Sequence, residues 1–489
     1  MTTTLTEQIL EQTNPLYIGG EFVSAGDGQV IDVINPATGR WVGCVPKGGR
    51  KEAEQAIDAA HQAFPLWAGL TPQLRADFMQ AWAKKIRNNI EEIAYILTAE
   101  QGKPLYESRE EAEGAAQFIE WYAEEGKRLY GETVPASATN KRIIVIRQPV
   151  GVTALITPWN YPATMVARKA APALAAGCTL VLKPASQTPL TAVALVRLAH
   201  EAGMPAGVIN LVTGTASLIG QEFMANPLIR KVSFTGSTEV GKELIRASAN
   251  QVKRLSLELG GNAPFIVFPD ADLDAAVAAA VGNKFENCGQ MCNGINVIYV
   301  HEKIADEFSH RMSESVATLR VGHGIVEQTQ LGPVIDQRSV DHIESLVQAA
   351  VAQGAQVLVG GHRMKESPYD QGSFFAPTVL VNVHDDMQLA QEEIFGPVAP
   401  IIPFQGEDEV LEKVNRTPYG LAAYLFTRDV RRVFEISERL QTGMVAVNSA
   451  SLSVPQAPFG GIKQSGYGRE GGHHGLEEFT NLKYISLTL

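Results

Sequence analysis

Apolar side chains along this chain repeat with two different periods. In residues 52–68, 74–102 and 110–131 they recur every three to four positions, which predicts packing helices. From residues 151 to 261, short apolar runs rich in β-branched side chains alternate with helical stretches, and a similar alternation continues from residue 263 to 448. Strand-helix alternation indicates parallel sheets covered by helices, so we expect an α/β fold with two such units.

Two other stretches favour a small β arm. Residues 142–152 begin with an alternating, β-branched segment, and residues 477–489 are strand-like and apolar. We therefore divide the chain into one α/β domain (residues 1–127 and 149–257), a second (258–459), and an arm with the C-terminal tail (128–148 and 460–489). Because an exposed strand edge tends to pair with another chain, the arm predicts a homo-oligomer, either a dimer or a dimer of dimers.

Composition narrows the possible partners. With 489 residues, 45% of them hydrophobic, the chain is long enough for two or three domains, and a formal net charge of −12 disfavours nucleic acid or an anionic membrane as the main partner. Four cysteines are too few for a disulfide scaffold, the first residues show no targeting pattern, and the apolar stretches are too short for a membrane helix. We expect a cytoplasmic protein with no membrane span and no metal site.

Small and polar residues follow several of the predicted strands. In a parallel sheet ligands bind beyond the carboxyl ends of the strands, and TPWNY, KPASQT, VTGT and FTGS all fall there. The segment FTGSTEVG lacks the spacing of the dinucleotide fingerprint, but it joins a strand to a helix that should open at Thr238 or Glu239. The start of such a helix can hold a phosphate.

Three side chains are candidates for catalysis, and each has an ordinary structural alternative. A free cysteine is most often a buried hydrophobe, and we assign Cys44 and Cys178 to that class, but Cys292 lies in the polar, flexible segment FENCGQMCN. A nucleophilic thiol calls for an electropositive pocket, which we expect here. Glu258 is either an edge residue or a base facing a cleft, and Asn160 is either a turn residue or an oxyanion donor.

Seven motifs in order carry a resemblance that spans essentially the whole chain: TPWNY, KPASQT, FTGSTEVG, LELGG, FENCGQMC, EEIFGPV and APFGGIKQSGYGREGG. The chain resembles the NAD(P)-dependent aldehyde dehydrogenase superfamily, and within it the succinate-semialdehyde dehydrogenase group. The resemblance implies a doubly wound Rossmann-type cofactor domain, an α/β catalytic domain and a small β oligomerisation arm. A non-catalytic scaffold with this fold would be expected to lose the nucleophile or the base, and neither is missing.

The resemblance also assigns roles to residues. It makes Cys292 the nucleophile, Glu258 the general base, and Asn160 with the Cys292 amide the oxyanion hole, in a non-acylating enzyme that hydrolyses its thioester. It implies cofactor contacts at twelve positions: Thr157, Pro158, Trp159, Lys183, Ser186, Gly214, Phe234, Gly236, Ser237, Leu259, Glu393 and Phe395. Relatives that prefer NAD usually carry Glu at the position of Ser186, so we expect both nucleotides to be used and NADP to be preferred.

The implied substrate is a small aldehyde that bears an acidic group. Arg168 and Ser453 match two members of the family's carboxylate clamp, but Glu286 stands where the second arginine is expected. Two carboxylates about 4 Å apart repel by roughly 4 kcal/mol at an effective dielectric near 20. Glu286 either points away, pairs with Arg168 and suits a less charged aldehyde, or orients Arg168 toward a differently shaped acid. The main expectation is succinate semialdehyde, and the alternatives are glutarate semialdehyde and a hydroxylated or sulfonated aldehyde.

Cys288 raises a question of redox control. Some relatives carry a cysteine two residues after the nucleophile, where this chain has Gly294. Cys288 lies four residues before Cys292 instead, and a bridge between them would need a compact local conformation.

Overall fold

The first of two large sheets carries the predicted alternation of residues 151–261. The computed structural model describes residues 3–489. In spatial order the sheet contains β19 (Gly466–Tyr467), β11 (Arg254–Glu258), β10 (Ile229–Thr235), β7 (Val152–Ile156), β8 (Thr179–Lys183), β9 (Ile209–Leu211), β1 (Leu16–Ile18) and β2 (Glu21–Val23). The strands from β11 to β9 run parallel, and the outer strands pair antiparallel. This is a doubly wound sheet.

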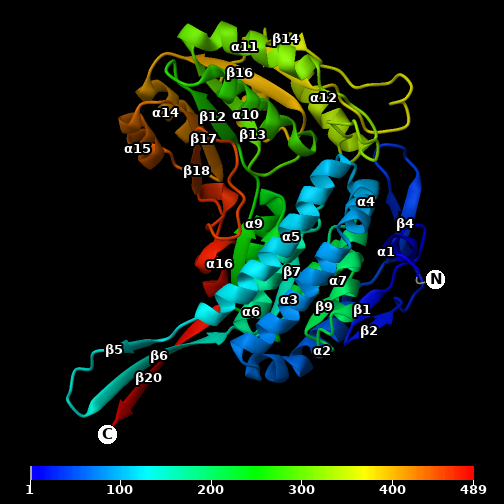
Figure 1. The fold of residues 1–489 in the computed structure, drawn as a ribbon, viewed down its shortest axis with the longest axis vertical. Helices are drawn as coiled ribbons and strands as arrows, with labels where there is room; N and C mark the ends of the chain where they lie inside the picture. The colour runs from blue at the N-terminus through cyan, green and yellow to red at the C-terminus, as the bar shows by residue number, and fades with distance from the viewer. Residues whose placement is uncertain (1–2) are drawn as a thin grey trace.

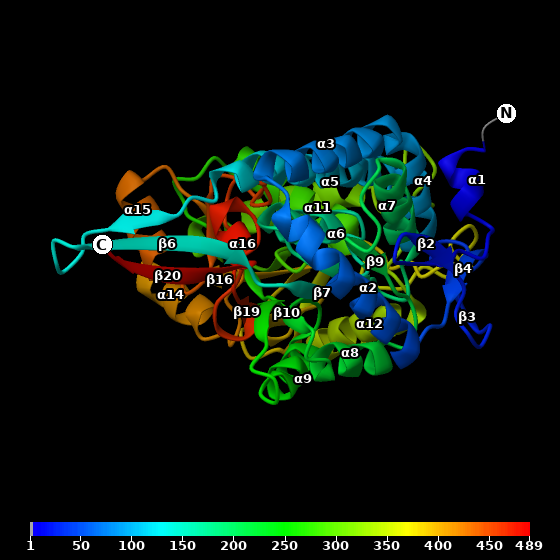
Figure 2. The same cartoon turned by 90° about the horizontal axis from the view of Figure 1, so that it is seen from below.

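Helices cover both faces of this sheet, as Figure 2 shows. One face carries α2 (Arg50–Gly69), α8 (Ala216–Ala225) and α9 (Thr238–Ser248), and the other carries α3 (Pro72–Asn88), α4 (Ile90–Gln101), α5 (Leu105–Glu125), α6 (Thr164–Ala176) and α7 (Leu190–Glu201). The single helix suggested by residues 74–102 is two helices, α3 and α4. They meet at Asn89, whose side chain donates to the carbonyl of Lys85 at 2.7 Å, an interaction that competes with helical hydrogen bonding.

The second sheet lies above the first in Figure 1. Its spatial order is β14 (Gln356–Val359), β15 (Thr378–Val381), β16 (Val398–Phe404), β13 (Ile295–His301), β12 (Ala263–Val267), β17 (Ala422–Phe426) and β18 (Met444–Val447). All neighbours except β14 and β15 are parallel. The sequence pattern did not single out β17, which is buried throughout between β12 and β18. The helices of this second unit are α10 (Leu273–Phe285), α11 (Glu302–Ala317), α12 (Gln337–Ala352), α13 (Gln388–Gln391), α14 (Glu407–Asn415) and α15 (Val430–Arg439).

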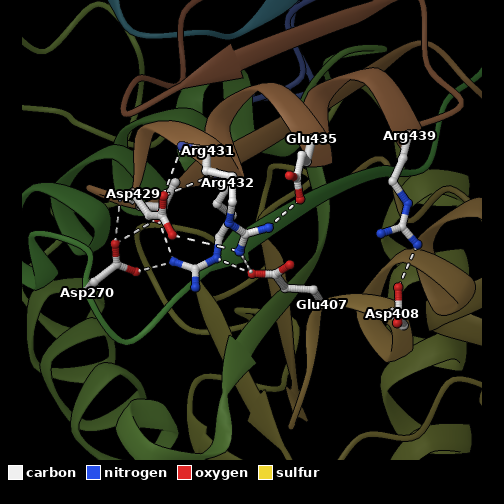
Figure 3. Close-up of polar contacts among 9 residues, drawn as sticks. Asp270, Glu407, Asp408, Asp429, Arg431, Arg432, Glu435 and Arg439 are labelled. Carbon is white, nitrogen blue, oxygen red and sulfur yellow. Dashed lines mark hydrogen bonds and ion pairs between the residues drawn. The ribbon is translucent and has the colours of Figure 1, made fainter.

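Ion pairs and hydrogen bonds connect α15 to the rest of this second unit (Figure 3). The Arg432 guanidinium contacts Asp270, which follows β12, and Glu407 at the start of α14, both at 2.8 Å. It also lies 4.3 Å from the centre of the Phe268 ring. Because Arg432 is mostly buried, these contacts are better shielded from water than the exposed ion pairs around them.

A three-stranded arm projects from the body (Figure 1). It consists of β5 (Glu132–Val134), β6 (Lys141–Pro149) and β20 (Thr480–Thr488), and β20 pairs antiparallel with β6 along its whole length. Leu482, Tyr484, Ile485 and Leu487 are exposed on β20. At the far end of the molecule, α1 (Leu5–Ile9) precedes β1, and β3 (Val30–Ile34) pairs with β4 (Trp41–Pro46).

The segment after residue 460 passes through the body before it reaches the arm. β19 pairs with the carboxyl end of β11, and α16 (Gly472–Glu477) packs against α6. Among the helices of residues 3–489, none is long and apolar enough to cross a membrane. Within the same residues no group of three or more His, Cys, Asp or Glu side chains is placed to hold a metal ion.

Candidate active site

Cys292 lines two cavities. It follows the short turn Glu286–Gly289 and precedes β13. One cavity, which we call the Arg168 cavity, lies among α5, α6 and residues 450–459 and is lined by Phe118, Tyr161, Met165, Arg168, Glu286, Leu452, Ser453 and Phe459, among others. The other, the Trp159 cavity, lies at the carboxyl ends of β7, β10 and β11 and is lined by Pro158, Trp159, Asn160, Thr235, Gly236, Ser237, Leu259, Gly260, Glu393 and Phe395.

The turn before Cys292 is held rigidly. Asn287 and Cys288 have positive φ angles of 47° and 57°, a conformation that costs free energy in residues other than glycine. The Asn287 amide N–H donates to Glu107 Oε2 at 3.0 Å, and its side chain donates to the carbonyl of Asn160 at 2.9 Å. Gln290 accepts a hydrogen bond from the amide of Ile335 at 2.8 Å. These contacts fix the backbone that presents the thiol.

The surroundings of the thiol differ from the electropositive pocket that the sequence suggested. Burial and, second to it, the nearby Glu393 carboxyl raise the pKa of Cys292 to about 12, while Arg168 acts in the opposite direction. The expected activation by positive charge is therefore wrong for this structure. Because the thiol is protonated near neutral pH, it must give up its proton when it attacks.

Asn160 lies beside Cys292 in the lining of the Trp159 cavity. Its side chain is buried, and the Nδ2 group donates to the carbonyl of Gln290 at 2.9 Å. Its backbone carbonyl accepts from Lys103 Nζ at 2.9 Å. An amide nitrogen carries two hydrogens, so a second donor is left for an oxygen bound near the sulfur.

Glu258 ends β11 and is almost fully buried. It lines neither cavity, and its Oε2 atom has no hydrogen-bond partner. Burial raises the pKa of Glu258 well above its usual value, and the Glu470 carboxyl adds to this effect. A Cβ atom at position 460 would lie 2.8 Å from Glu258 Oε1, so only glycine leaves room for the carboxyl here.

Two charged residues that sequence reasoning missed lie close to Glu258. The Lys169 ammonium forms an ion pair with Glu470 and also donates to Ser233 Oγ at 3.2 Å. The two charges act on the pKa of Glu258 in opposite directions. Lys169 lowers it, and Glu470 raises it. Lys169 follows Arg168 directly in α6, and Glu470 lies in the tail motif GREGG, but no sequence spacing links the two positions.

Most of the residues expected to contact a cofactor line the Trp159 cavity. Seven do so: Pro158, Trp159, Gly236, Ser237, Leu259, Glu393 and Phe395. The Trp159 and Phe395 rings meet edge to face with centroids 5.4 Å apart. Glu393 accepts from the amide of Gly261 at 3.1 Å, and burial raises its pKa to about 7.

Five other expected cofactor residues lie outside that lining. Thr157 and Lys183 stand at the ends of β7 and β8, where the Thr157 amide donates to the Lys183 carbonyl at 3.2 Å, and burial lowers the pKa of Lys183 to about 8. Ser186 follows at the partly exposed turn after β8. The Phe234 ring packs against Gly236. Gly214 packs against Gly48, where a Cβ atom would meet the Gly48 carbonyl at 1.9 Å, so its glycine serves backbone packing.

These features fit a bound nucleotide. The hydroxyls of Thr157 and Thr235 are buried without a hydrogen-bond partner at adjacent strand ends. α9 opens at Thr238 with Ser237 as its N-cap, so its first amides lie beside the Trp159 cavity. A helix start of this kind suits a phosphate, and the same cavity continues to the Cys292 sulfur.

Arg168 lines the Arg168 cavity. Its guanidinium lies between two aromatic rings, 4.3 Å from the centre of Phe459 and 5.0 Å from that of Phe118. Nη2 donates to Ser453 Oγ at 2.6 Å, whereas Nε and Nη1 are buried without a hydrogen-bond partner. Nε stands 4.0 Å from Glu470 Oε2, and the buried Nη1 has no partner of either kind, which suits an anionic ligand.

Glu286 lines the same cavity, so it does not point away from the site. Its Oε1 atom accepts a hydrogen bond from the Tyr161 hydroxyl at 2.7 Å, and no ion pair joins it to Arg168 in the part of the chain described. The two rings and Ser453 orient Arg168 without its help. The Glu286 side chain remains exposed to solvent, and partial desolvation in the cavity raises its pKa.

The remaining cysteines are free thiols. Cys288 is buried in the core of the second sheet, and burial raises its pKa, whereas Cys292 is only partly buried. Cys44 and Cys178 are buried as well, as their strand-like contexts suggested.

The chain is similar to known proteins over most of its length. The model of the aldehyde dehydrogenase family matches residues 22–485. The glutarate-semialdehyde dehydrogenase of Pseudomonas putida is 50% identical, with 97% of each chain covered. The NADP(+)-dependent succinate-semialdehyde dehydrogenase of Escherichia coli is 49% identical, covering 96% of this chain and 97% of that protein. A 3-sulfolactaldehyde dehydrogenase of Pseudomonas putida is 50% identical, with 96% of each chain covered.

Solved structures show the same fold. The crystal structure of a succinate-semialdehyde dehydrogenase from Burkholderia pseudomallei superposes with a TM-score of 0.96 at 47% identity, and the match covers 99% of each chain.

Proposed function

The chain belongs to the aldehyde dehydrogenase family, and on that premise we propose that it oxidises a small acid-bearing aldehyde to the carboxylic acid with reduction of NADP or NAD. The observation that carries the proposal is the position of Cys292, which lines both the Arg168 cavity and the Trp159 cavity. An aldehyde held by Arg168 and a nucleotide held in the Trp159 cavity would meet at this sulfur.

The residues divide the reaction between them. The Cys292 thiol passes its proton to water and its sulfur attacks the aldehyde carbon, and the oxygen that gains negative charge is held by Asn160 Nδ2 and the Cys292 amide. A bound nicotinamide supplies the hydride acceptor. Glu258 then takes a proton from water, which hydrolyses the resulting thioester to the acid. Because Glu258 lines neither cavity, its side chain must turn toward Cys292 for this step.

Two features support the choice of nucleotide. Ser186, in the turn after β8, offers no carboxylate to repel a 2′-phosphate. Lys183 ends β8 and makes no ion pair within residues 3–489. The Escherichia coli relative is named for NADP(+). NADP is therefore the preferred nucleotide, and NAD is also used.

The protein acts as a homo-oligomer in the cytoplasm. The exposed apolar side chains on β20 would be covered by a second copy, as a dimer or a dimer of dimers. Free, sparse cysteines suit a reducing compartment.

The test is a substrate profile measured by nucleotide reduction. We expect succinate semialdehyde and glutarate semialdehyde to be oxidised with kcat/KM at least about tenfold above butanal, because a hydrogen bond to a charged group contributes roughly 1.5–3 kcal/mol. The same assay includes a three-carbon sulfonated hydroxyaldehyde. Arg168→Ala should abolish the preference for acids, and Cys292→Ser should abolish turnover of every aldehyde. Equal rates for butanal and the acids would refute the assigned substrate class.

A further inference from the structure

We propose that Lys103 is a positioning residue for the oxyanion hole: its buried ammonium holds the Asn160 backbone so that the Asn160 side chain can donate to the oxyanion. This inference rests on the proposed function. Lys103 lines neither the Arg168 cavity nor the Trp159 cavity, so it acts on the reaction through other residues and not by touching substrate or nucleotide.

Asn160 depends on side-chain contacts for its position. It lies in the irregular segment 157–163, between β7 and α6, where no strand or helix fixes the backbone. Its Nδ2 group donates to the Gln290 carbonyl at 2.9 Å, which leaves one hydrogen for the oxyanion. A donor of this kind is effective only when it is held in place before the charge forms, so neighbouring side chains must fix the Asn160 backbone.

The Lys103 ammonium supplies such a contact. Its side chain is 0% exposed, and Nζ donates to the Asn160 carbonyl at 2.9 Å and to Glu111 Oε2 at 2.6 Å. Nζ also lies 3.6 Å from the centre of the Tyr161 ring. The cation therefore contacts both residues that the 160–161 peptide bond joins.

The same carbonyl accepts a second hydrogen bond. Asn287 Nδ2 donates to Asn160 O at 2.9 Å, so both lone pairs of this oxygen are used. Gln101 connects the two donors, because its Nε2 donates to Asn287 Oδ1 at 2.8 Å and its Oε1 accepts from the Lys103 amide at 2.9 Å. One network at the end of α4 thus holds the Asn160 backbone and the turn that presents Cys292.

Glu111 balances the ammonium and fixes the start of α6. Its Oε1 atom accepts from the amides of Ala163 and Thr164 at 2.8 and 3.2 Å. A carboxylate suits this place because the first amides of a helix have no partner within the helix. The Lys103–Glu111 pair therefore holds the second half of the segment that carries Asn160.

Stability alone does not explain a buried ion pair at this point. Enclosing an ammonium and a carboxylate costs desolvation free energy that largely offsets their attraction, and apolar side chains of the same volume are often equally stable. Apolar side chains cannot donate to a carbonyl. The contacts of Lys103 therefore favour a role in placing the Asn160 backbone over a role in folding.

The experiment measures the rate of NADPH formation in the first turnover with succinate semialdehyde. Lys103→Met keeps a long, unbranched side chain without its charge. Loss of an oxyanion donor lowers the rate by about 100- to 1000-fold, so we expect that loss in Asn160→Ala and a loss of at least about tenfold in Lys103→Met. Adding Lys103→Met to Asn160→Ala should change the rate no further, because no donor remains to be positioned.

Alkylation of Cys292 by iodoacetamide gives a readout that a general defect of the site would change. The sulfur displaces iodide without forming an oxyanion, so the alkylation rate in Lys103→Met should stay at the wild-type value. Lys231→Met is the matched control for the first-turnover rate, which it should leave unchanged. Lys231 is also 0% exposed and pairs with Glu478 at 3.2 Å, but it lies outside both cavities.

Thermal unfolding checks that each variant is folded. Lys103→Met/Glu111→Gln serves where an unpaired Glu111 prevents folding, because Gln keeps an acceptor for the α6 amides and both charges are gone. This variant should fold and show the same loss of rate as Lys103→Met. If neither variant folds, the pair serves folding and the inference is wrong.

Three results in folded variants would overturn the inference and leave the proposed function intact. One is a wild-type first-turnover rate in Lys103→Met, and another is a further loss when this change is added to Asn160→Ala. The third is slower alkylation of Cys292, since the turn that carries the thiol would then have moved. A wild-type enzyme that oxidises no aldehyde would instead remove the proposed function.

Discussion

Lys169 and Glu470 lie 301 positions apart in the chain and form an ion pair between two almost fully enclosed side chains. The pair stands beside Glu258, and both charges act on the pKa of that carboxyl. The protonation of the proposed base therefore depends on a contact between α6 and the C-terminal segment.

Replacing Glu470 should move the pH dependence of turnover. Glu258 can act as a base only when deprotonated, so kcat should fall as the pH drops through its raised pKa. Glu470→Gln removes a negative neighbour and leaves Lys169 unpaired, and both changes lower the pKa of Glu258. The acidic limb of the kcat profile should shift to lower pH. A limb that stays in place would show that another group titrates, and unfolding midpoints check that the variant is folded.

Ser453→Ala should weaken substrate binding with little change in kcat. The Ser453 hydroxyl accepts the 2.6 Å hydrogen bond that holds the Arg168 guanidinium, and a bond to a charged group contributes roughly 1.5–3 kcal/mol. We expect KM for an acid-bearing aldehyde to rise by about tenfold or more. Ser451→Ala, two residues away, should change KM less than twofold, and an equal effect of both would argue for a general loop defect.

Ser186→Glu should shift the nucleotide preference toward NAD. A carboxylate at this turn would face the 2′-phosphate of NADP, and like charges at such a distance repel by roughly 1–4 kcal/mol depending on the local dielectric. The ratio of kcat/KM for NADP to that for NAD should fall at least about tenfold. Ser186→Gln has the same length without the charge and should leave the ratio nearer to that of the wild type. If Ser186→Glu leaves the NADP-to-NAD ratio unchanged, the 2′-phosphate of NADP does not bind near this turn.

Arg432→Ala should destabilise the second unit (Figure 3). It removes two partly buried ion pairs and the contact with Phe268, so we expect a loss of about 1–3 kcal/mol of unfolding free energy in urea. Arg428→Ala is the control, because its pair with Asp272 is exposed and should contribute less than about 1 kcal/mol. Equal losses would mean that burial does not set the strength of these pairs.

Cys288→Ser should leave peroxide inactivation unchanged. Cys288 is buried in the core of the second sheet and burial raises its pKa, so its thiolate is scarce and inaccessible. The rate of activity loss should stay within about twofold of the wild type. Slower inactivation in the variant, together with a Cys288–Cys292 peptide under non-reducing conditions, would establish the bridge between them.

The sequence predicted the alternating strands and helices well because burial on a parallel sheet imposes long apolar runs. It missed β17 and the break at Asn89, where a single polar side chain outweighs the periodicity. It placed Cys292, Asn160 and seven cofactor candidates through motifs, and the structure brings these residues together at one pair of cavities. It could not supply the Lys169–Glu470 pair or the raised pKa of Cys292, since both depend on contacts between segments far apart in the chain.

The position of the tail also sets when the site can exist during synthesis. Gly460 makes room for the Glu258 carboxyl, Gly466 pairs with its backbone, and Glu470 acts on its charge. All three lie C-terminal to Arg168 and Cys292, so they leave the ribosome after those two residues. A nascent chain therefore carries its thiol and its arginine before it has the surroundings of its base.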